Sequence, residues 1–200
     1  GVSDMAGGGS NLDVLAGGPP CQGYSGIGIR RSYSVDKANI PSNHLYVRMA
    51  NVVRRLRPRI VLFENVQGLL TAKWTSTGCE LIFPDVLTEF RSIDGYEFRY
   101  TLVRAKDYGV PQNRPRILLV GIRKDVIAAS DIVDPNADPD GVDAVKCGFL
   151  PGRTRGFPDL IDLLGDLIDP TVEEVLKSGS FEKGPFVTRE YPSAPRNDLQ

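Results

Sequence analysis

The sequence predicts an α/β domain built around an open β-sheet that is mostly parallel and ends in an antiparallel hairpin. Two observations lead to this prediction. Residues 43–57 have the spacing of an amphipathic helix and lie between two apolar, strand-like runs at 12–16 and 60–66. Farther along, two more strand-like runs, 96–104 and 116–123, are joined by a short, turn-rich segment. A strand–helix–strand order favours a right-handed parallel crossover, and a short connection favours an antiparallel pair.

The first strand leads directly into the segment GGPPCQGYS, residues 17–25. Each proline fixes its own φ and restrains the residue before it, so Pro19 and Pro20 stiffen the backbone that presents Cys21. Open α/β sheets bind their ligands beyond the carboxyl ends of the strands. We therefore interpret Cys21 as a candidate nucleophile at the tip of a strand.

The helix at 43–57 has one apolar face and is ended by Pro58; the face consists of Leu45, Met49, Val52, Val53 and Leu56. The strand that follows, IVLFENV at 60–66, ends near Glu64 and Asn65. Because parallel neighbours end at the same edge of a sheet, this order predicts that Cys21 and Glu64 lie at one edge.

The rest of the chain reads less regularly. A second helix is expected from about Pro84 to Ile93, while residues 22–42 show no periodicity and are typical of a lid or a binding loop. Residues 130–158 are rich in Asp, Pro and Gly and predict an irregular linker, followed by a short amphipathic helix. We therefore expect a core at 1–125, and a linker with the start of a variable region at 126–200.

Composition narrows the class of protein. The 200 residues are 41% apolar, which suits one domain or part of a larger one. The three cysteines, Cys21, Cys79 and Cys147, include no Cys-x-x-Cys pair, which argues against a disulfide framework or a metal site and suits a reducing compartment. No apolar run approaches the roughly 20 residues that span a membrane. Gly1 is not a natural start, so earlier residues are expected.

Charge is distributed unevenly along the chain. Residues 1–125 hold 17 Lys and Arg against 11 Asp and Glu, a net charge of +6, whereas residues 126–200 hold 7 against 14, a net charge of −7. The half with the candidate nucleophile is therefore basic, as a surface that faces phosphates would be. Ordinary surface charge explains the same counts equally well.

Four residues stand out chemically: Cys21, Glu64, Arg114 and Arg116. Taken singly, each has a common structural explanation, as a core cysteine, a cap or ion-pair carboxylate, and a solvated arginine pair. A cysteine protease would also need a histidine base, and the single histidine, His44, has no evident residue to orient it.

Together these groups fit one task, the activation of a pyrimidine. A thiolate can add to carbon 6 of the ring only if the charge that it creates is accepted elsewhere on the ring. A carboxylic acid can protonate or hydrogen-bond a ring nitrogen, and arginines can hold a ring carbonyl and help to keep the thiol ionised. Carbon 5 of the ring then becomes nucleophilic.

Three segments, in order and spacing, resemble the motifs of cytosine-5 DNA methyltransferases. DVLAGGPPCQGYS, residues 13–25, looks like the family's catalytic-cysteine motif. RPRIVLFENVQGLL, residues 57–70, resembles its Glu-Asn-Val motif, and AKDYGVPQNRPRILLVGIR, residues 105–123, resembles its Gln-x-Arg-x-Arg motif. The resemblance implies a partial Rossmann-like methyltransferase sheet.

The resemblance also implies roles for single residues. Cys21 would add to carbon 6 of cytosine, Glu64 would contact ring nitrogen 3 and the exocyclic amine, and Arg116 would hold the carbonyl oxygen. Asn65 would shape the site. Arg114 and Gln112 would brace the site, Pro20 would position Cys21, and Pro19 and Pro20 would lie near the methyl donor.

The loop at 22–42 would close on DNA. Its expected contacts to the substrate come from Gln22, Ser25, Arg30 and Arg31. Because carbon 5 is stacked within a duplex, the target base would have to be flipped out.

The family uses S-adenosyl-L-methionine, and double-stranded DNA is its substrate. We find no Phe-x-Gly-x-Gly cofactor loop, no closing C-terminal motif and no target-recognition domain, so we expect a central segment that alone binds cofactor poorly and turns over little. We further expect a monomeric protein of the bacterial cytoplasm, associated with the nucleoid and not with a membrane, with a restriction endonuclease as a possible partner.

Two alternatives remain open. A transfer-RNA cytosine-5 methyltransferase would carry the same motifs. A catalytically inactive homologue that binds DNA would be of a different class, although the three motifs are intact.

Overall fold

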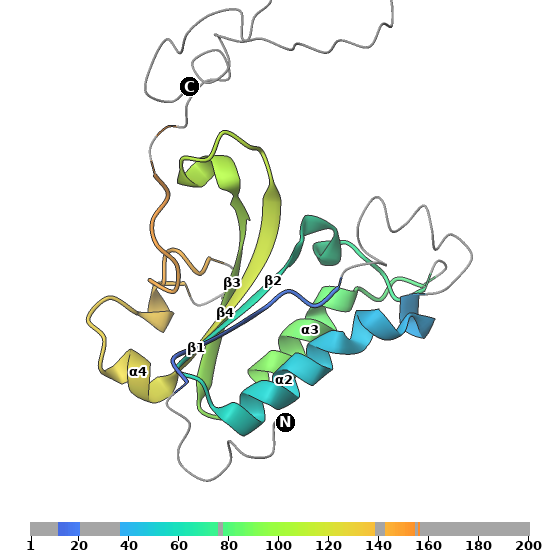
Figure 1. Cartoon of the computed structure of the whole chain (residues 1–200), viewed down its shortest axis with the longest axis horizontal. Helices are drawn as coiled ribbons and strands as arrows, with labels where there is room; N and C mark the ends of the chain where they lie inside the picture. Colours follow the sequence, from blue (N-terminus) through green and yellow to red (C-terminus); the bar gives the residue numbers. More distant parts are fainter. Residues whose placement is uncertain (1–11, 21–36, 76–77, 139–142, 155, 157–200) are drawn as a thin grey trace, which may run out of the picture. The chain divides into compact units, whose positions relative to one another are not determined.

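The computed structural model describes residues 12–20, 37–75, 78–138, 143–154 and 156 (Figure 1). The chain divides into two compact units: residues 1–104 with 114–153, and residues 105–113 with 154–200. The first unit contains the sheet and the α-helices. No helix in the described ranges is long and apolar enough to cross a membrane.

Four strands form one open sheet in the order β1-β2-β4-β3; they are β1 (Val14–Gly17), β2 (Ile60–Val66), β3 (Tyr96–Arg104) and β4 (Pro115–Arg123). β1 and β2 are parallel, whereas β4 runs antiparallel to both β2 and β3. The α/β class, the open sheet and the hairpin are therefore confirmed. The expectation of a mostly parallel sheet is corrected, because one of the three pairings in the described residues is parallel.

The position of β4 between β2 and β3 follows from its composition. β4 carries an almost continuous apolar run, with buried residues on both of its faces: Ile117, Leu119, Val120 and Ile122. Such a run is typical of a strand that is covered on both sides. β3 occupies the edge of the described sheet, where Glu97 and Arg99 stay partly exposed while Thr101 is buried.

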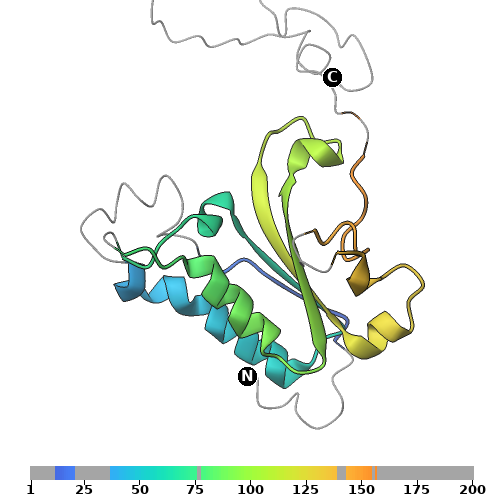
Figure 2. The same ribbon diagram turned by 180° about the vertical axis from the view of Figure 1, so that it is seen from behind.

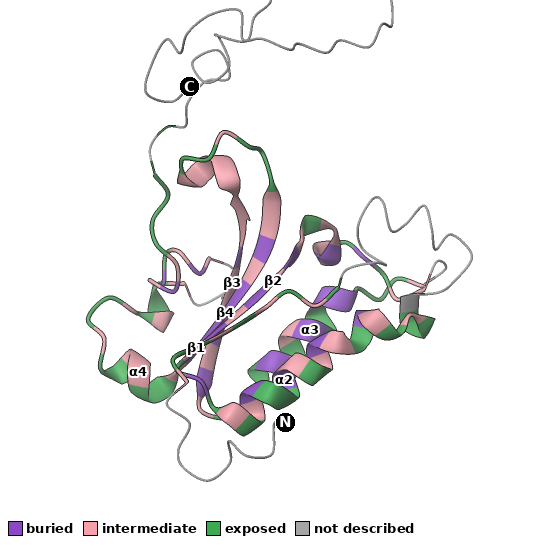
Figure 3. Ribbon diagram, in the orientation of Figure 1, coloured by how far each residue is buried: buried purple, intermediate pink, exposed green. Residues whose placement is uncertain are grey.

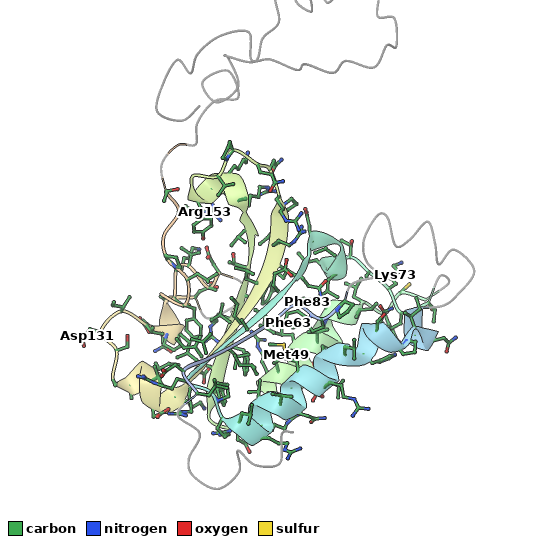
Figure 4. All side chains as sticks on the ribbon, viewed as in Figure 1. Met49, Phe63, Lys73, Phe83, Asp131 and Arg153 are labelled. Atoms are coloured by element: carbon green, nitrogen blue, oxygen red, sulfur yellow. The ribbon has the colours of Figure 1, made fainter. Side chains whose placement is uncertain are left out.

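One face of the sheet packs against α2 (Leu45–Leu56) and α3 (Ile82–Arg91), which run side by side in both ribbon views (Figures 1 and 2). The layer between them forms the larger core, with Phe63, Phe90 and Phe98 buried at its centre. Figure 4 shows Met49 of α2 and Phe63 of β2 in this layer. This face supplies most of the apolar burial in the unit.

The predicted helix face needs one correction. α2 buries Tyr46, Ala50 and Val53, a spacing of four and three residues, while Val52 is 36% exposed. The helix begins at Leu45 because a 3-10 turn at Pro41–His44 precedes it.

α3 begins two residues earlier than expected. It starts at Ile82, which places Pro84 inside the first turn, where its missing N–H costs no helical hydrogen bond. The strands at 60–66 and 96–104 have the predicted bounds. The strand predicted at 12–16 begins two residues later and ends one residue later, and the strand predicted at 116–123 begins one residue earlier.

The opposite face of the sheet carries a second, smaller apolar cluster. Ala144, Cys147 and Phe149 pack there on Val120 and Ile122 of β4, beside the short helix α4 (Lys124–Ala128). The expected linker at 130–158 therefore includes residues that lie on the sheet. The predicted domain boundary at residue 125 stays a prediction.

At the amino end of β2, several contacts around Tyr96 join neighbouring segments. Its hydroxyl donates a hydrogen bond to the Pro58 carbonyl, and the Arg57 guanidinium lies 5.0 Å from its ring centroid. Arg57 ends α2 with a φ of 49°, and its carbonyl accepts a hydrogen bond of 2.8 Å from Arg123. The amino end of β2 is thus fixed, while its carboxyl end carries the candidate site.

Candidate active site

The register of β1 and β2 brings the proline segment beside the end of β2. Gly17 pairs with Phe63, so the residues after Gly17 continue alongside Glu64 and Asn65. The Asn65 side-chain amide donates a hydrogen bond of 3.1 Å to the Pro19 carbonyl. The parallel pairing of β1 and β2 is confirmed, whereas the predicted position of Cys21 beside Glu64 concerns a residue outside the described ranges and stays a prediction.

Asn65 is the buried part of this arrangement. It is 4% exposed and faces the helix side of the sheet, because it follows the buried positions Val61 and Phe63 at intervals of two. Its amide nitrogen bonds Pro19, and its carbonyl oxygen accepts a hydrogen bond of 2.9 Å from the Val66 N–H. Both ends of the amide are satisfied, so the side chain fixes the position of the proline segment.

Glu64 and Arg116 meet on the opposite face. Glu64 stands across the ladder from Leu118, and Arg116 across from Val66, which makes them diagonal neighbours on one face. Glu64 Oε1 lies 2.7 Å from Arg116 Nε, and the side chains are 44% and 20% exposed. The Arg116 guanidinium also donates a hydrogen bond of 2.8 Å to the Pro115 carbonyl.

The Glu64–Arg116 pair is partly exposed, so it is better suited to binding a ligand than to stabilising the fold. An ion pair that is half open to water contributes only about 0–1 kcal/mol to stability. The pair instead holds a carboxylate and a planar cation side by side at an accessible edge. Such a pair can bind a flat ring that offers both a nitrogen and a carbonyl oxygen.

A small pocket lies beside the proline segment, on the helix side of the sheet. It is lined by Pro19, Pro20, Ser42, Asn43, Tyr46, Phe63, Asn65, Leu69 and Val86. Burial, and then the nearby carboxylates of Asp85 and Glu89, raise the pKa of Tyr46 above its usual value. A phenol is protonated at neutral pH already at its ordinary pKa of about 10, so Tyr46 is able to donate a hydrogen bond there.

This pocket does not fit S-adenosylmethionine, the cofactor that the resemblance implies. Its cavity volume of about 10 Å³, which is room for about one water molecule, is far below what a ligand of that size needs. The lining also includes no carboxylate for the ribose hydroxyls or for the positive sulfur. The described residues thus form no complete cofactor site, and the chemistry derived below concerns the base alone.

Two of the remaining predicted residues are described, and both are exposed. Arg114 is exposed just before β4, and Gln112 is exposed in the second unit. Outside the described residues lie Cys21, Gln22, Ser25, Arg30 and Arg31. Their roles stay predictions.

Two features of the site do not follow from its motif residues alone. Gly18, between the strand and the prolines, lies against Glu64: a Cβ there would stand 3.0 Å from Glu64 Oε2. His44 stacks on Trp74 with a centroid distance of 5.0 Å, and its Nε2 lies 2.8 Å from the Ala38 carbonyl. The Gly-Gly pair at the end of a strand is the sequence signal for the first feature, and nothing local signals the second.

The described ranges contain two free cysteines and no candidate metal centre. No group of three potential metal ligands occurs there. Cys79 is a free, exposed cysteine and Cys147 a free, buried one. Cys79 therefore provides a natural control for experiments on Cys21.

A family model described as C-5 cytosine-specific DNA methylase matches residues 7–169. Among curated proteins, the type II methyltransferase M.DdeI of Desulfomicrobium norvegicum is 31% identical over 191 residues, which cover 96% of this chain and 38% of that protein. The type II methyltransferase M.AgeI of Thalassovita gelatinovora is 32% identical over 195 residues, or 94% of this chain and 40% of that protein. The chain thus spans less than half the length of either relative.

A solved structure from an E. coli prophage, described as a DNA modification methyltransferase, is 29% identical and has a TM-score of 0.43. The likeness covers 66% of this chain and 32% of that chain. A TM-score at this level adds nothing to the family match.

Proposed function

This chain belongs to the family of C-5 cytosine-specific DNA methylases, and we propose that the protein methylates carbon 5 of cytosine in double-stranded DNA. The observation that carries the proposal is the Glu64–Arg116 pair, 2.7 Å apart at an open sheet edge. The same edge receives the backbone segment that leads into Cys21, through the bond from Asn65 to the Pro19 carbonyl.

In the proposed reaction the Cys21 thiolate forms a bond to carbon 6 of a flipped cytosine. The electron pair of the ring's 5,6 double bond moves toward carbon 5 and is shared with nitrogen 3 and the carbonyl oxygen. Glu64 donates a proton or a hydrogen bond to nitrogen 3, and Arg116 holds the carbonyl oxygen. Carbon 5 thereby becomes the nucleophile.

The family's methyl donor, S-adenosylmethionine, would supply the methyl group. Loss of the proton from carbon 5 and release of the sulfur from carbon 6 would then restore the aromatic ring and the free thiol. In this proposal Pro19 and Pro20 contribute their backbone beside the methyl donor, and the 22–42 loop, with Gln22, Ser25, Arg30 and Arg31, closes on the DNA.

The remaining proposed roles are supporting ones. Arg114 and Gln112 brace the site, and residues 126–200 begin the variable region of the protein. The names of the type II methyltransferase relatives support a restriction–modification setting in a bacterial cytoplasm.

The test uses protein expressed from its complete gene, duplex DNA of random sequence in which 5-fluorocytosine replaces cytosine, and S-adenosylmethionine. Fluorine at carbon 5 cannot leave as a proton does, so the protein should stay covalently joined to the DNA and migrate slowly in a denaturing gel. Cys21→Ala should abolish this adduct, whereas Cys79→Ala, at an exposed cysteine outside the site, should keep it.

An adduct that persists in Cys21→Ala would overturn the assignment of the nucleophile. Methyl transfer to transfer RNA but not to duplex DNA would replace DNA with RNA as the substrate. Robust methyl transfer by the 200-residue chain alone would contradict the expectation that it binds the donor poorly.

A further inference from the structure

Gly18 occupies a place where space, not backbone conformation, requires glycine. It follows β1 at the level of Glu64, since Gly17 pairs with Phe63. Positive φ angles in the described residues occur at other positions, so the backbone at Gly18 is open to any L-residue. A Cβ built there would lie 3.0 Å from Glu64 Oε2 and 3.6 Å from the Glu64 carbonyl oxygen. The first distance is shorter than ordinary van der Waals contact.

The Glu64 carboxylate is therefore bounded on two sides. Oε1 is held by Arg116 Nε at 2.7 Å, and Oε2 lies in the space that the missing side chain of Gly18 leaves. A methyl group at position 18 would have to push the carboxylate away by a few tenths of an ångström or turn it. Because Glu64 is 44% exposed, it has room to move, so the change should alter its position more than the stability of the fold.

We propose that Gly18 is a positioning residue that sets the place of the Glu64 carboxylate beside Arg116, and so its reach to the base. This inference rests on the proposed function, because the carboxylate must meet one ring nitrogen. Misplacing a catalytic group by about 1 Å can cost roughly 100-fold in rate. For the smaller shift at Gly18→Ala we expect a loss of about tenfold or more in formation of the covalent adduct.

Gly17 provides a matched control. A Cβ at Gly17, the last residue of β1, would lie 3.0 Å from Met49 Sδ and 3.3 Å from its Cε, a similar encroachment on a side chain of α2. The thioether is flexible and adjusts to its neighbours. Gly17→Ala should therefore change the melting temperature somewhat and leave both the Glu64–Arg116 contact and the rate of adduct formation per folded molecule unchanged.

The first measurement is independent of activity. The Nε–H resonance of Arg116 in a ¹⁵N-correlated NMR spectrum reports its ion-pair contact with Glu64 Oε1. Glu64→Gln identifies the resonance and its shift when the charge of the acceptor is lost. Gly18→Ala should move this resonance in the same direction, while Gly17→Ala should leave it in place.

The second measurement is the rate of adduct formation with 5-fluorocytosine DNA. An unmoved Arg116 resonance in Gly18→Ala overturns the inference, and so does a moved resonance with a wild-type rate. A moved resonance together with a rate lowered about tenfold or more supports it. If the unmutated protein forms no adduct at all, the proposed function fails, and the NMR comparison still decides whether Gly18 sets the carboxylate's position.

Discussion

The two faces of β2 differ in what they bury. Toward α2 and α3, Val61 and Phe63 are at most 1% exposed and belong to the larger core. On the other face the smaller cluster lies around Val120 and Ile122, and the Glu64 side chain stays 44% exposed. Buried and half-buried positions alternate along β2 (Figure 3). The face of β2 toward the helices thus contributes buried apolar side chains to the core, and the other face presents an accessible carboxylate. Substitutions on the two faces should therefore separate unfolding free energy from activity.

The largest effect on stability is expected on the helix face. Phe63→Ala should lower the free energy of unfolding by about 3–5 kcal/mol, because it opens a cavity among packed aromatic rings. The measurement is urea denaturation followed by circular dichroism. Leu62→Ala, on the neighbouring, half-buried position of the other face, is the matched control and should cost clearly less. Equal losses at the two positions would contradict the asymmetry of the faces.

The next effect concerns the buried amide that joins the two strands. Asn65→Ala leaves the Pro19 carbonyl and the Val66 N–H without their partner and should cost about 1–3 kcal/mol. Asn51→Ala, an exposed asparagine on α2, should stay within roughly 0.5 kcal/mol in the same denaturation experiment. If both variants unfold alike, Asn65 does not fix the proline segment.

A smaller effect should appear at alkaline pH. Burial raises the pKa of Tyr96 above the ordinary value of about 10, against the opposing charges of Arg57 and Arg123. The folded state thus holds its phenol proton more tightly than the unfolded state does. Its contribution is complete below about pH 10 and is lost as pH rises through the higher folded pKa.

Unfolding free energies at pH 8 and pH 11 test this dependence. Tyr96→Phe removes the titrating group together with the bond to the Pro58 carbonyl, so the variant should be less stable at pH 8 and should lose less on going to pH 11. Burial also raises the pKa of Tyr46, so the pH dependence of Tyr46→Phe is compared with that of Tyr96→Phe. An unchanged pH dependence in Tyr96→Phe would remove Tyr96 as its source.

The smallest stability effect is expected on the open face, where the effect on activity is large. Glu64→Gln should change the unfolding free energy by only about 0–1 kcal/mol, because the pair with Arg116 is half exposed. The same variant should slow adduct formation by roughly 10²–10⁴-fold, the usual contribution of a general acid. Glu89→Gln, which breaks another part-exposed ion pair, to Arg54, should leave adduct formation unchanged. A near-wild-type rate in Glu64→Gln would remove Glu64 from the proposed mechanism.

The sequence by itself determined the class of fold, most elements and the residues to inspect. Periodicity located the strands at 60–66 and 96–104 and both long helices, since local spacing of apolar residues reflects which face is buried. The motifs pointed to Glu64, Asn65 and Arg116 before any contact was known.

Tertiary structure decided what local patterns do not contain. The insertion of β4 between β2 and β3 depends on pairing between distant segments, and only that register brings Arg116 diagonally opposite Glu64. The space at Gly18 likewise exists only because a neighbouring strand places a carboxylate there. Sequence spacing fixes which way a side chain points along its own strand, whereas the partner that it meets is set by strands far away in the chain.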